Sequence, residues 1–239
     1  LKVIRHRATD SRNRIGALLV NPGGPGGSAT DYAYNAESIV APEIYQRYDI
    51  VGFDPRGIKN SEPIRCLTNR ETDKFLEASP TGGNPDEIAK LIAVSKAFAA
   101  KCAKAAGEKL GHYSTLETAK DMEVLRNILR EEKLNYLGKS YGTYLGTLYA
   151  ALYPDSVGKF VLDGAVAPNI TLREQEISQA VGFDSALNQY IAKNNKFDRD
   201  EILKFIAKSK RKPLQSDSGR NLSESLIVTA IAQSLYNSK

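Results

Sequence analysis

A serine between two glycines is the strongest chemical signal in the sequence. The segment Gly138–Gly142 (GKSYG) has the G-x-S-x-G spacing in which a serine lies on a sharp turn between a strand and a helix. Glycine is needed at both flanks because the turn brings the residues two before and two after the serine close together. The motif predicts that Ser140 is the nucleophile of an acyl-transfer reaction; the alternative is a tight strand-to-helix connection with no chemistry.

The residues around this turn favour the nucleophile. An apolar run at residues 134–137 precedes it, and Gly142, Gly146 and Ala150 recur every four residues after it, on one face of a helix. Small residues on that face would let the helix lie close to the sheet. The helix N-terminus would then direct free N–H groups at the Ser140 oxygen and favour the negative charge that develops during acyl transfer.

A glycine-rich loop, Asn21–Gly27, is the predicted second element of the site. An oxyanion hole in this arrangement needs one backbone N–H after the nucleophile and one from an earlier strand-to-helix loop. Tyr141 N–H would supply the first, and Gly23 or Gly24 the second. The alternatives are a plain turn or a phosphate-binding loop, which fits poorly because the Lys and Ser/Thr of a P-loop are missing and Pro25 has no N–H donor.

The partners that would activate the serine are not evident. The two histidines, His6 and His112, both precede Ser140, whereas this type of site has its acid and then its His after the nucleophile. Structural roles are expected for both. Asp163 follows a predicted strand and could be the acid, although an Asp before Gly is equally a turn residue. We expect the acid and base to lie beyond Lys239 or on another chain, and these 239 residues to be nearly inactive alone.

Apolar runs of strand length alternate with helical patterns, which predicts an α/β fold, a mostly parallel sheet with helices on both faces. The runs are residues 15–20, 48–53, 134–137 and 159–162, and residues 1–6 alternate as a further strand. After residue 168 the pattern is helical alone, so this part should form a separate layer or lid. We therefore expect a core over residues 1–168 and the beginning of a helical cap over residues 169–239.

Capping residues predict where the helices begin and end. The expected starts are Asn84, Ser114, Thr171, Asp198 and Leu222. Gly107 should end the helix that starts after Asn84. Residues 208–213 (KSKRKP) are expected to form a solvated loop between helices rather than a nucleic-acid site.

The composition excludes several function classes. With 33 Lys and Arg against 28 Asp and Glu, the net charge of +5 is spread along the chain and does not indicate nucleic-acid binding. No stretch approaches the roughly 18 consecutive apolar residues of a transmembrane segment. Cys and His residues at metal-ligand spacing are absent, so no metal or cofactor is expected. Cys66 and Cys102 could form one disulfide or remain two buried thiols.

Four segments in combination resemble the secreted bacterial tripeptidyl aminopeptidases of the α/β-hydrolase superfamily, relatives of the prolyl iminopeptidases. They are residues 21–28 (NPGGPGGS), 53–63 (FDPRGIKNSEP), 134–146 (LNYLGKSYGTYLG) and 161–168 (VLDGAVAP). With the two cysteines and the intervening helices, the similarity runs from about residue 1 to residue 170. Two positions depart from the family pattern, which usually has Gly at Lys59 and Asp at Ala167.

This resemblance implies a function and a compartment. It makes Ser140 the acylated nucleophile, places Tyr141 with Gly23 and Gly24 around the oxyanion, and pairs Cys66 with Cys102 in an enzyme that is secreted or held in the cell envelope. The chain lacks both an initiator Met and a signal peptide, so we expect that an upstream segment has been removed.

The implied substrate is a peptide with a free N-terminus, from which such a serine peptidase releases tripeptides. In the family the triad Asp and His follow the helical cap, so the C-terminal part of the same protein would be needed for activity. Two alternatives stay open: an esterase or lactam hydrolase of the same fold, and a non-catalytic hydrolase-like protein.

Overall fold

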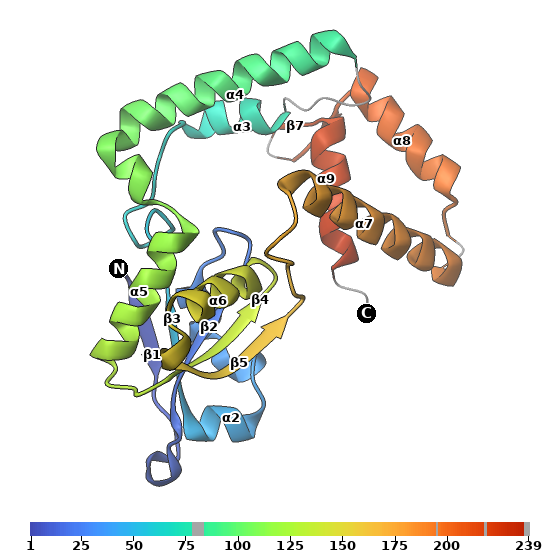
Figure 1. Ribbon diagram of the computed structural model, residues 1–239. Helices are drawn as coiled ribbons and strands as arrows, with labels where there is room; N and C mark the ends of the chain where they lie inside the picture. The colour runs from blue at the N-terminus through green and yellow to red at the C-terminus, as the bar shows by residue number, and fades with distance from the viewer. Residues whose placement is uncertain (78–83, 195, 218, 237–239) are drawn as a thin grey trace. The chain divides into compact units, whose positions relative to one another are not determined.

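Five stretches of the chain pair into one sheet in the computed structural model, which describes residues 1–77, 84–194, 196–217 and 219–236 (Figure 1). In spatial order the strands are β1 (Val3–His6), β3 (Tyr48–Phe53), β2 (Gly16–Asn21), β4 (Leu134–Lys139) and β5 (Val157–Asp163). β1 is antiparallel to β3, and all other neighbours are parallel. The predicted α/β class and mostly parallel sheet are confirmed.

Helices cover both faces of this sheet (Figure 1). On one face, buried residues of β2, β3 and β4 pack against α5 (Thr115–Ile128) and α6 (Tyr141–Leu152). On the other face, β2 and β3 pack against α1 (Ala29–Tyr34) and the segment that leads into α2 (Pro42–Arg47). Leu18 and Leu19, adjacent in β2, therefore belong to different cores. This double coverage explains why the central strands are apolar without alternation.

The chain divides into two units, and the division differs from the expected domains. The first unit contains residues 1–64 and 106–169, and the second contains residues 65–105 and 170–239. The expected boundary after residue 168 lies one residue from the observed one. Residues 65–105, however, group with the C-terminal helices and not with the sheet. The periodicity of a helix shows which face is apolar, but not which neighbour will cover it.

The second unit is mainly helical. Its elements are α3 (Asn69–Glu77), α4 (Pro85–Ala106), α7 (Leu172–Asn194), α8 (Arg199–Arg211), α9 (Glu224–Leu235) and the two-residue strands β6 (Leu214–Gln215) and β7 (Asn221–Leu222). Within this unit Cys66 and Cys102 form a disulfide, and the rings of Phe75 in α3 and Phe98 in α4 lie 4.9 Å apart.

The first unit also contains short 3-10 helices, η1 (Ser11–Asn13), η2 (Ala36–Ser38), η3 (Gly107–His112) and η4 (Pro154–Ser156).

Most predicted helix starts are confirmed. The Ser114 hydroxyl accepts from Glu117 N–H at 3.2 Å, and Asp198 forms a capping box with Glu201. Thr171 and Glu174 bond reciprocally in the same way. These three cap residues, each three positions before a Glu, thus satisfy amide groups that a helix leaves free.

Two expectations for the C-terminal helices are wrong. Leu222 does not begin a helix, because it pairs with Leu214 in the β6–β7 strand pair, and α9 starts at Glu224. Residues 208–211 are not a loop, because α8 continues to Arg211. Basic side chains in the last turn of a helix are stabilised by its negative dipole end, so a run of positive charge is compatible with a helix terminus.

A buried carboxylate near the amino end of β3 pairs with two arginines, one of which, Arg5, lies in β1. Asp49 of β3 is 2% exposed, and its carboxylate accepts from Arg5 Nε at 3.0 Å, Arg14 Nε at 2.8 Å and Ala8 N–H at 2.8 Å. Burial alone would raise the pKa of Asp49, but these hydrogen bonds outweigh it and lower the pKa below its ordinary value. The carboxylate therefore stays charged and paired inside the fold.

None of the helices in the described ranges is both long and apolar enough to cross a membrane.

We expect Glu123→Gln to destabilise the first unit in a pH-dependent way. Glu123 in α5 accepts from Arg126 Nη2 at 2.6 Å and from Tyr149 Oη of α6 at 2.7 Å. The Arg126 hydrogen bond chiefly lowers the pKa of Glu123 from 4.5 to about 2. A lowered pKa stabilises the fold above the unfolded pKa, and this contribution disappears as the pH falls toward 2. Loss of about 1–2 kcal/mol at pH 7 is expected, and clearly less at pH 2.5.

Denaturant unfolding at the two pH values measures this difference. Glu132→Gln, at an exposed position nearby, is the control and should change little at either pH. A deficit for Glu123→Gln that is equal at both pH values would contradict the assignment of the contact.

Candidate active site

Ser140 lies on the sharp turn that the motif predicts, between the last residue of β4 and the first residue of α6. Its backbone has φ 52° and ψ −123°, in the region that residues other than glycine rarely occupy. Ser140 N–H donates to Asp163 O at 2.9 Å, and Thr143 N–H donates to Ser140 O at 2.8 Å, so the main chain is held on both sides. The side chain is exposed, and its hydroxyl makes no hydrogen bond with any described residue.

Glycines make this turn sterically feasible. A Cβ atom on Gly138 would lie 2.5 Å from Gly142 O, and one on Gly146 would lie 2.7 Å from Tyr136 Cε1. The buried Tyr136 hydroxyl donates to Gly142 O at 2.7 Å. The helix therefore lies directly on the strand that precedes the serine, as the spacing of small residues predicted, and Tyr136 fixes its first turn.

The glycine-rich loop lies against Ser140. A Cβ on Gly23, which has φ +91°, would be 2.3 Å from Lys139 O, 3.0 Å from Ser140 Cβ and 3.1 Å from Tyr141 N. Only glycine allows a left-handed backbone at such close range. The loop and the serine turn, 117 positions apart in the sequence, thus lie directly against each other.

The structure distinguishes between the two predicted loop donors. Gly23 is buried, and its N–H donates to Asn21 Oδ1 at 2.9 Å. Gly24 is exposed, and its N–H has no acceptor among the described residues. Tyr141 N–H is the first amide of α6 and has no acceptor within the helix. Of the two predicted loop donors, Gly24 is therefore the one with a free amide, and Tyr141 N–H is the free amide of the serine turn.

A buried carboxylate holds the far end of the loop. Asp54, directly after β3, is fully buried and accepts from Ser28 Oγ at 2.9 Å, Thr30 N–H at 3.1 Å and Thr30 Oγ1 at 2.9 Å. Ser28 in turn caps α1 through Asp31 N–H. Burial would raise the pKa of Asp54, but the hydrogen bonds from Thr30, Ser28 and Asn60 outweigh it and lower the pKa. Asp54 is thus charged, and its charge is balanced by donors from α1 and its cap.

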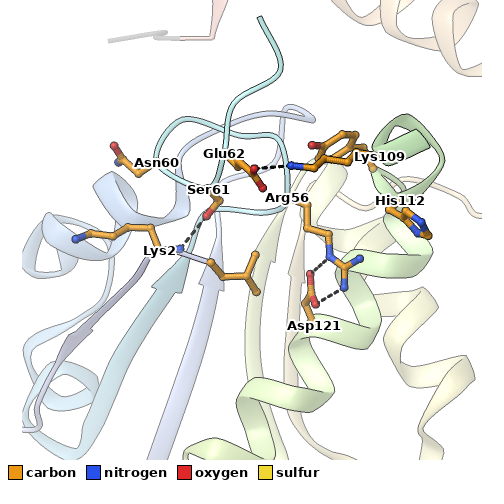
Figure 2. Close-up of a pocket in the computed structure, with 10 residues that line it drawn as sticks. Lys2, Arg56, Asn60, Ser61, Glu62, Lys109, His112 and Asp121 are labelled. Carbon is orange, nitrogen blue, oxygen red and sulfur yellow. Dashed lines mark hydrogen bonds and ion pairs between the residues drawn. The ribbon is translucent and has the colours of Figure 1, made fainter. Parts of the chain in front are cut away.

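The turn after Asp54 carries a second ionic contact. Arg56 points at α5, where its Nε and Nη2 bond the two oxygens of Asp121, both at 2.7 Å (Figure 2). Its Nη1 also reaches Glu117 at 3.1 Å. Arg56 and Asp121 lie in the wall of a polar cavity of about 590 Å³. Lys59 lies in the same turn and has φ +38°, a left-handed backbone, at a position where the family usually has Gly. Its ammonium group contacts the Asp31 carboxylate.

The described residues do not bring an acid and a base to Ser140. Asp163 is next to the serine through its carbonyl, but its carboxylate is exposed and 3.6 Å from Lys139 Nζ. The His6 ring packs 6.2 Å from Tyr34 and 6.3 Å from Tyr45, and His112 lines the cavity beside Arg56. Neither histidine hydrogen-bonds Ser140. Within the described ranges no three His, Cys, Asp or Glu side chains cluster as metal ligands.

Comparison with known proteins identifies the fold family. The model of the alpha/beta hydrolase fold family matches residues 16–224. The chain belongs to the alpha/beta hydrolase fold family. The predicted resemblance is confirmed as well, since the chain is 42% identical over 172 residues to the tripeptidyl aminopeptidase of Streptomyces coelicolor, a match that covers 71% of this chain and 32% of that protein.

Two other relatives of this alpha/beta hydrolase are named as a protease and as an esterase. The chain is 38% identical over 194 residues to the serine protease Hip1 of Mycobacterium tuberculosis, and 39% identical over 195 residues to carboxylesterase B of the same species. Each match covers 80% of this chain and 37% of the relative. The chain thus spans about a third of the length of the curated relatives it matches.

Sequence reasoning missed Asn21 and Asp54, the two side chains that hold the loop of this alpha/beta hydrolase at its ends. Both lie at the carboxyl end of a buried strand: Asn21 is the last residue of β2, and Asp54 directly follows β3. A polar residue at the carboxyl end of a parallel strand is a signal that could have found them, because such ends converge where ligands bind.

We expect Gly23→Ala to be far more disruptive than Gly26→Ala. Both residues have positive φ, 91° and 102°, so each substitution carries a backbone cost of about 1–2 kcal/mol. The Cβ at position 26 would meet only Ile58 Cδ1 at 3.8 Å, whereas the Cβ at position 23 would collide with the backbone of Lys139. Denaturant unfolding should therefore show a clearly larger loss for Gly23→Ala. Equal losses would show that the loop does not lie against the serine turn.

Proposed function

We propose that this chain carries the nucleophile and oxyanion hole of a serine hydrolase that acts on peptides as an aminopeptidase. One observation carries the proposal: the exposed hydroxyl of Ser140 lies on a strained turn, the next residue, Tyr141, has a free N–H, and Gly23 of the glycine-rich loop lies directly against this turn. Strain of this kind is typical of functional sites.

The geometry supports an acyl-enzyme mechanism. Ser140 Oγ attacks the carbonyl carbon of the scissile bond, and the carbonyl oxygen becomes an oxyanion between Tyr141 N–H and Gly24 N–H. The serine proton passes to a general base, and then to the leaving amine as the carbon–nitrogen bond breaks. Water, deprotonated by the same base, attacks the acyl-enzyme and regenerates Ser140.

The base and its acid are proposed to come from outside the residues described above. His6 is packed between two tyrosine rings, and His112 lines a cavity with Arg56, so neither is available to Ser140. Asp163 already faces Lys139. Without a base the serine hydroxyl is a poor nucleophile at neutral pH, so we expect residues 1–239 alone to be nearly inactive.

Names of the relatives support a peptide substrate. Two of them are called a tripeptidyl aminopeptidase and a serine protease. We therefore favour release of tripeptides from free N-termini. Ester hydrolysis is the second candidate, because a relative of similar identity is called carboxylesterase B and the same acyl-enzyme can form from an ester. The Cys66–Cys102 disulfide supports an oxidising location, which we propose to be outside the cell or in its envelope.

Labelling with a fluorophosphonate tests the nucleophile. In the full-length protein the probe should attach to Ser140, and Ser140→Ala should abolish the adduct and lower kcat by at least about 10⁴-fold. Ser114→Ala, which removes a serine from a different helix start, should still be labelled. Labelling that persists in Ser140→Ala, or a wild-type protein that is neither labelled nor active, would refute the proposal and favour a non-catalytic protein.

The substrate class is tested with matched chromogenic substrates. The full-length protein should cleave a tripeptidyl amide with a free N-terminus at least about 10-fold faster, in kcat/KM, than the same amide with an acetylated N-terminus, because loss of one charged contact costs at least about 1.4 kcal/mol. Cleavage of simple esters without cleavage of either amide would favour the esterase instead.

A further inference from the structure

We propose that the turn Asp54–Pro55–Arg56 is a positioning element that sets the spacing between the two halves of the oxyanion hole. This inference rests on the proposed function. The two amides come from separate parts of the chain, Gly24 from the loop after β2 and Tyr141 from the start of α6. A carbonyl oxygen can bond both only if these parts are held at a fixed distance.

Asp54 holds the half that contains Gly24. Its carboxylate accepts two bonds from Thr30 and one from Ser28, which lies one residue after the loop. At the other end of the loop, Asn21 Oδ1 accepts from Gly23 N–H at 2.9 Å. With both ends tied, the exposed segment that contains Gly24 has little freedom to move away from Ser140.

Arg56 holds the half that contains Tyr141. Its guanidinium forms a two-point contact with Asp121 of α5 and a further one with Glu117. One residue into α5, Thr115 Oγ1 hydrogen-bonds the Tyr141 hydroxyl at 2.8 Å. The same short turn is thus bonded in one direction to Ser28 and Thr30, just after the loop that provides Gly24, and in the other to the helix that contacts Tyr141.

Ion pairing dominates the contact of Arg56 with α5. The Arg56 side chain is 33% exposed and borders the cavity of about 590 Å³, so there is open space on one side of it (Figure 2). A planar guanidinium that bonds both oxygens of one carboxylate fixes the orientation of the two groups as well as their distance. A lysine ammonium fixes only the distance. Substitution at Arg56 should therefore change the position of α5 relative to the turn more than it changes the core.

Asp49 provides a matched control on the same strand. It is buried as deeply as Asp54, accepts hydrogen bonds from backbone and side chains, and has a lowered pKa as well. It lies near the amino end of β3, however, whereas Asp54 follows the carboxyl end where Ser140 and the loop meet. A merely structural role predicts similar effects for both; a positioning role predicts different ones.

The experiment compares Asp54→Asn, Arg56→Lys and Asp49→Asn in the full-length protein. Asn at position 54 keeps the size, but in either orientation of its amide the NH₂ group faces a backbone N–H, that of Thr30 or that of Asn60, and neither can accept. For Asp54→Asn and Arg56→Lys we expect kcat to fall about 10-fold to 100-fold with KM changed less than about 3-fold, because misplacement by about 1 Å weakens transition-state contacts. Affinity for a peptidyl boronic acid, which forms a tetrahedral adduct on serine, should fall in parallel with kcat.

For Asp49→Asn we expect a lower melting temperature with kcat per folded molecule unchanged. The proposal is overturned if Asp54→Asn and Arg56→Lys retain wild-type kcat, or if all three variants lose activity only in proportion to their folded fraction. Should Asp54→Asn fail to fold, Ser28→Ala removes one of the same bonds and keeps the buried charge, and its kcat decides. If only the positioning proposal is wrong, fluorophosphonate will still label Ser140. If the proposed function is wrong, Ser140 will not be labelled.

Discussion

The site depends on one steric constraint: the backbone of Ser140 is left-handed, and its surroundings have no room for additional atoms. Ser140 has φ 52°, and a Cβ on Gly23 or on Gly138 would lie 2.3 Å or 2.5 Å from a carbonyl oxygen. Close packing of glycine against glycine is what places the hydroxyl outside the fold while its main chain remains fully bonded. The sheet, α6 and the loop after β2 have to meet at this point for the turn to exist.

Much of the architecture could be predicted because it follows from local patterns. Strands buried on both faces are mostly apolar with little alternation, so β2 and β3 are visible in the sequence. Helix starts with a capping box, such as Thr171 with Glu174, depend on residues three positions apart. Partners distant in the sequence are different: nothing local indicates that residues 65–105 group with the C-terminal helices, or that Leu222 pairs with Leu214.

The candidate site was predictable in its residue types but not in its details. The motif indicates Ser140, and a glycine-rich loop indicates where the second amide comes from. The choice between Gly23 and Gly24 depends on which amide Asn21 already engages, which is a property of folded geometry. The roles of Asp54 and Arg56 likewise depend on donors and acceptors 24 to 65 positions away, because the pairs join Asp54 to Thr30 and Arg56 to residues of α5.

A crystal structure of the full-length protein after phosphonylation of Ser140 would test the central claim most directly. The account predicts that one phosphonyl oxygen lies about 2.7–3.1 Å from both Tyr141 N and Gly24 N, since the adduct mimics the tetrahedral intermediate. It also predicts that the Gly23 N–H bond to Asn21 remains in place. An adduct whose oxygens face solvent, or a Gly24 amide turned away from the phosphorus, would contradict the assignment of this turn and loop as one catalytic site.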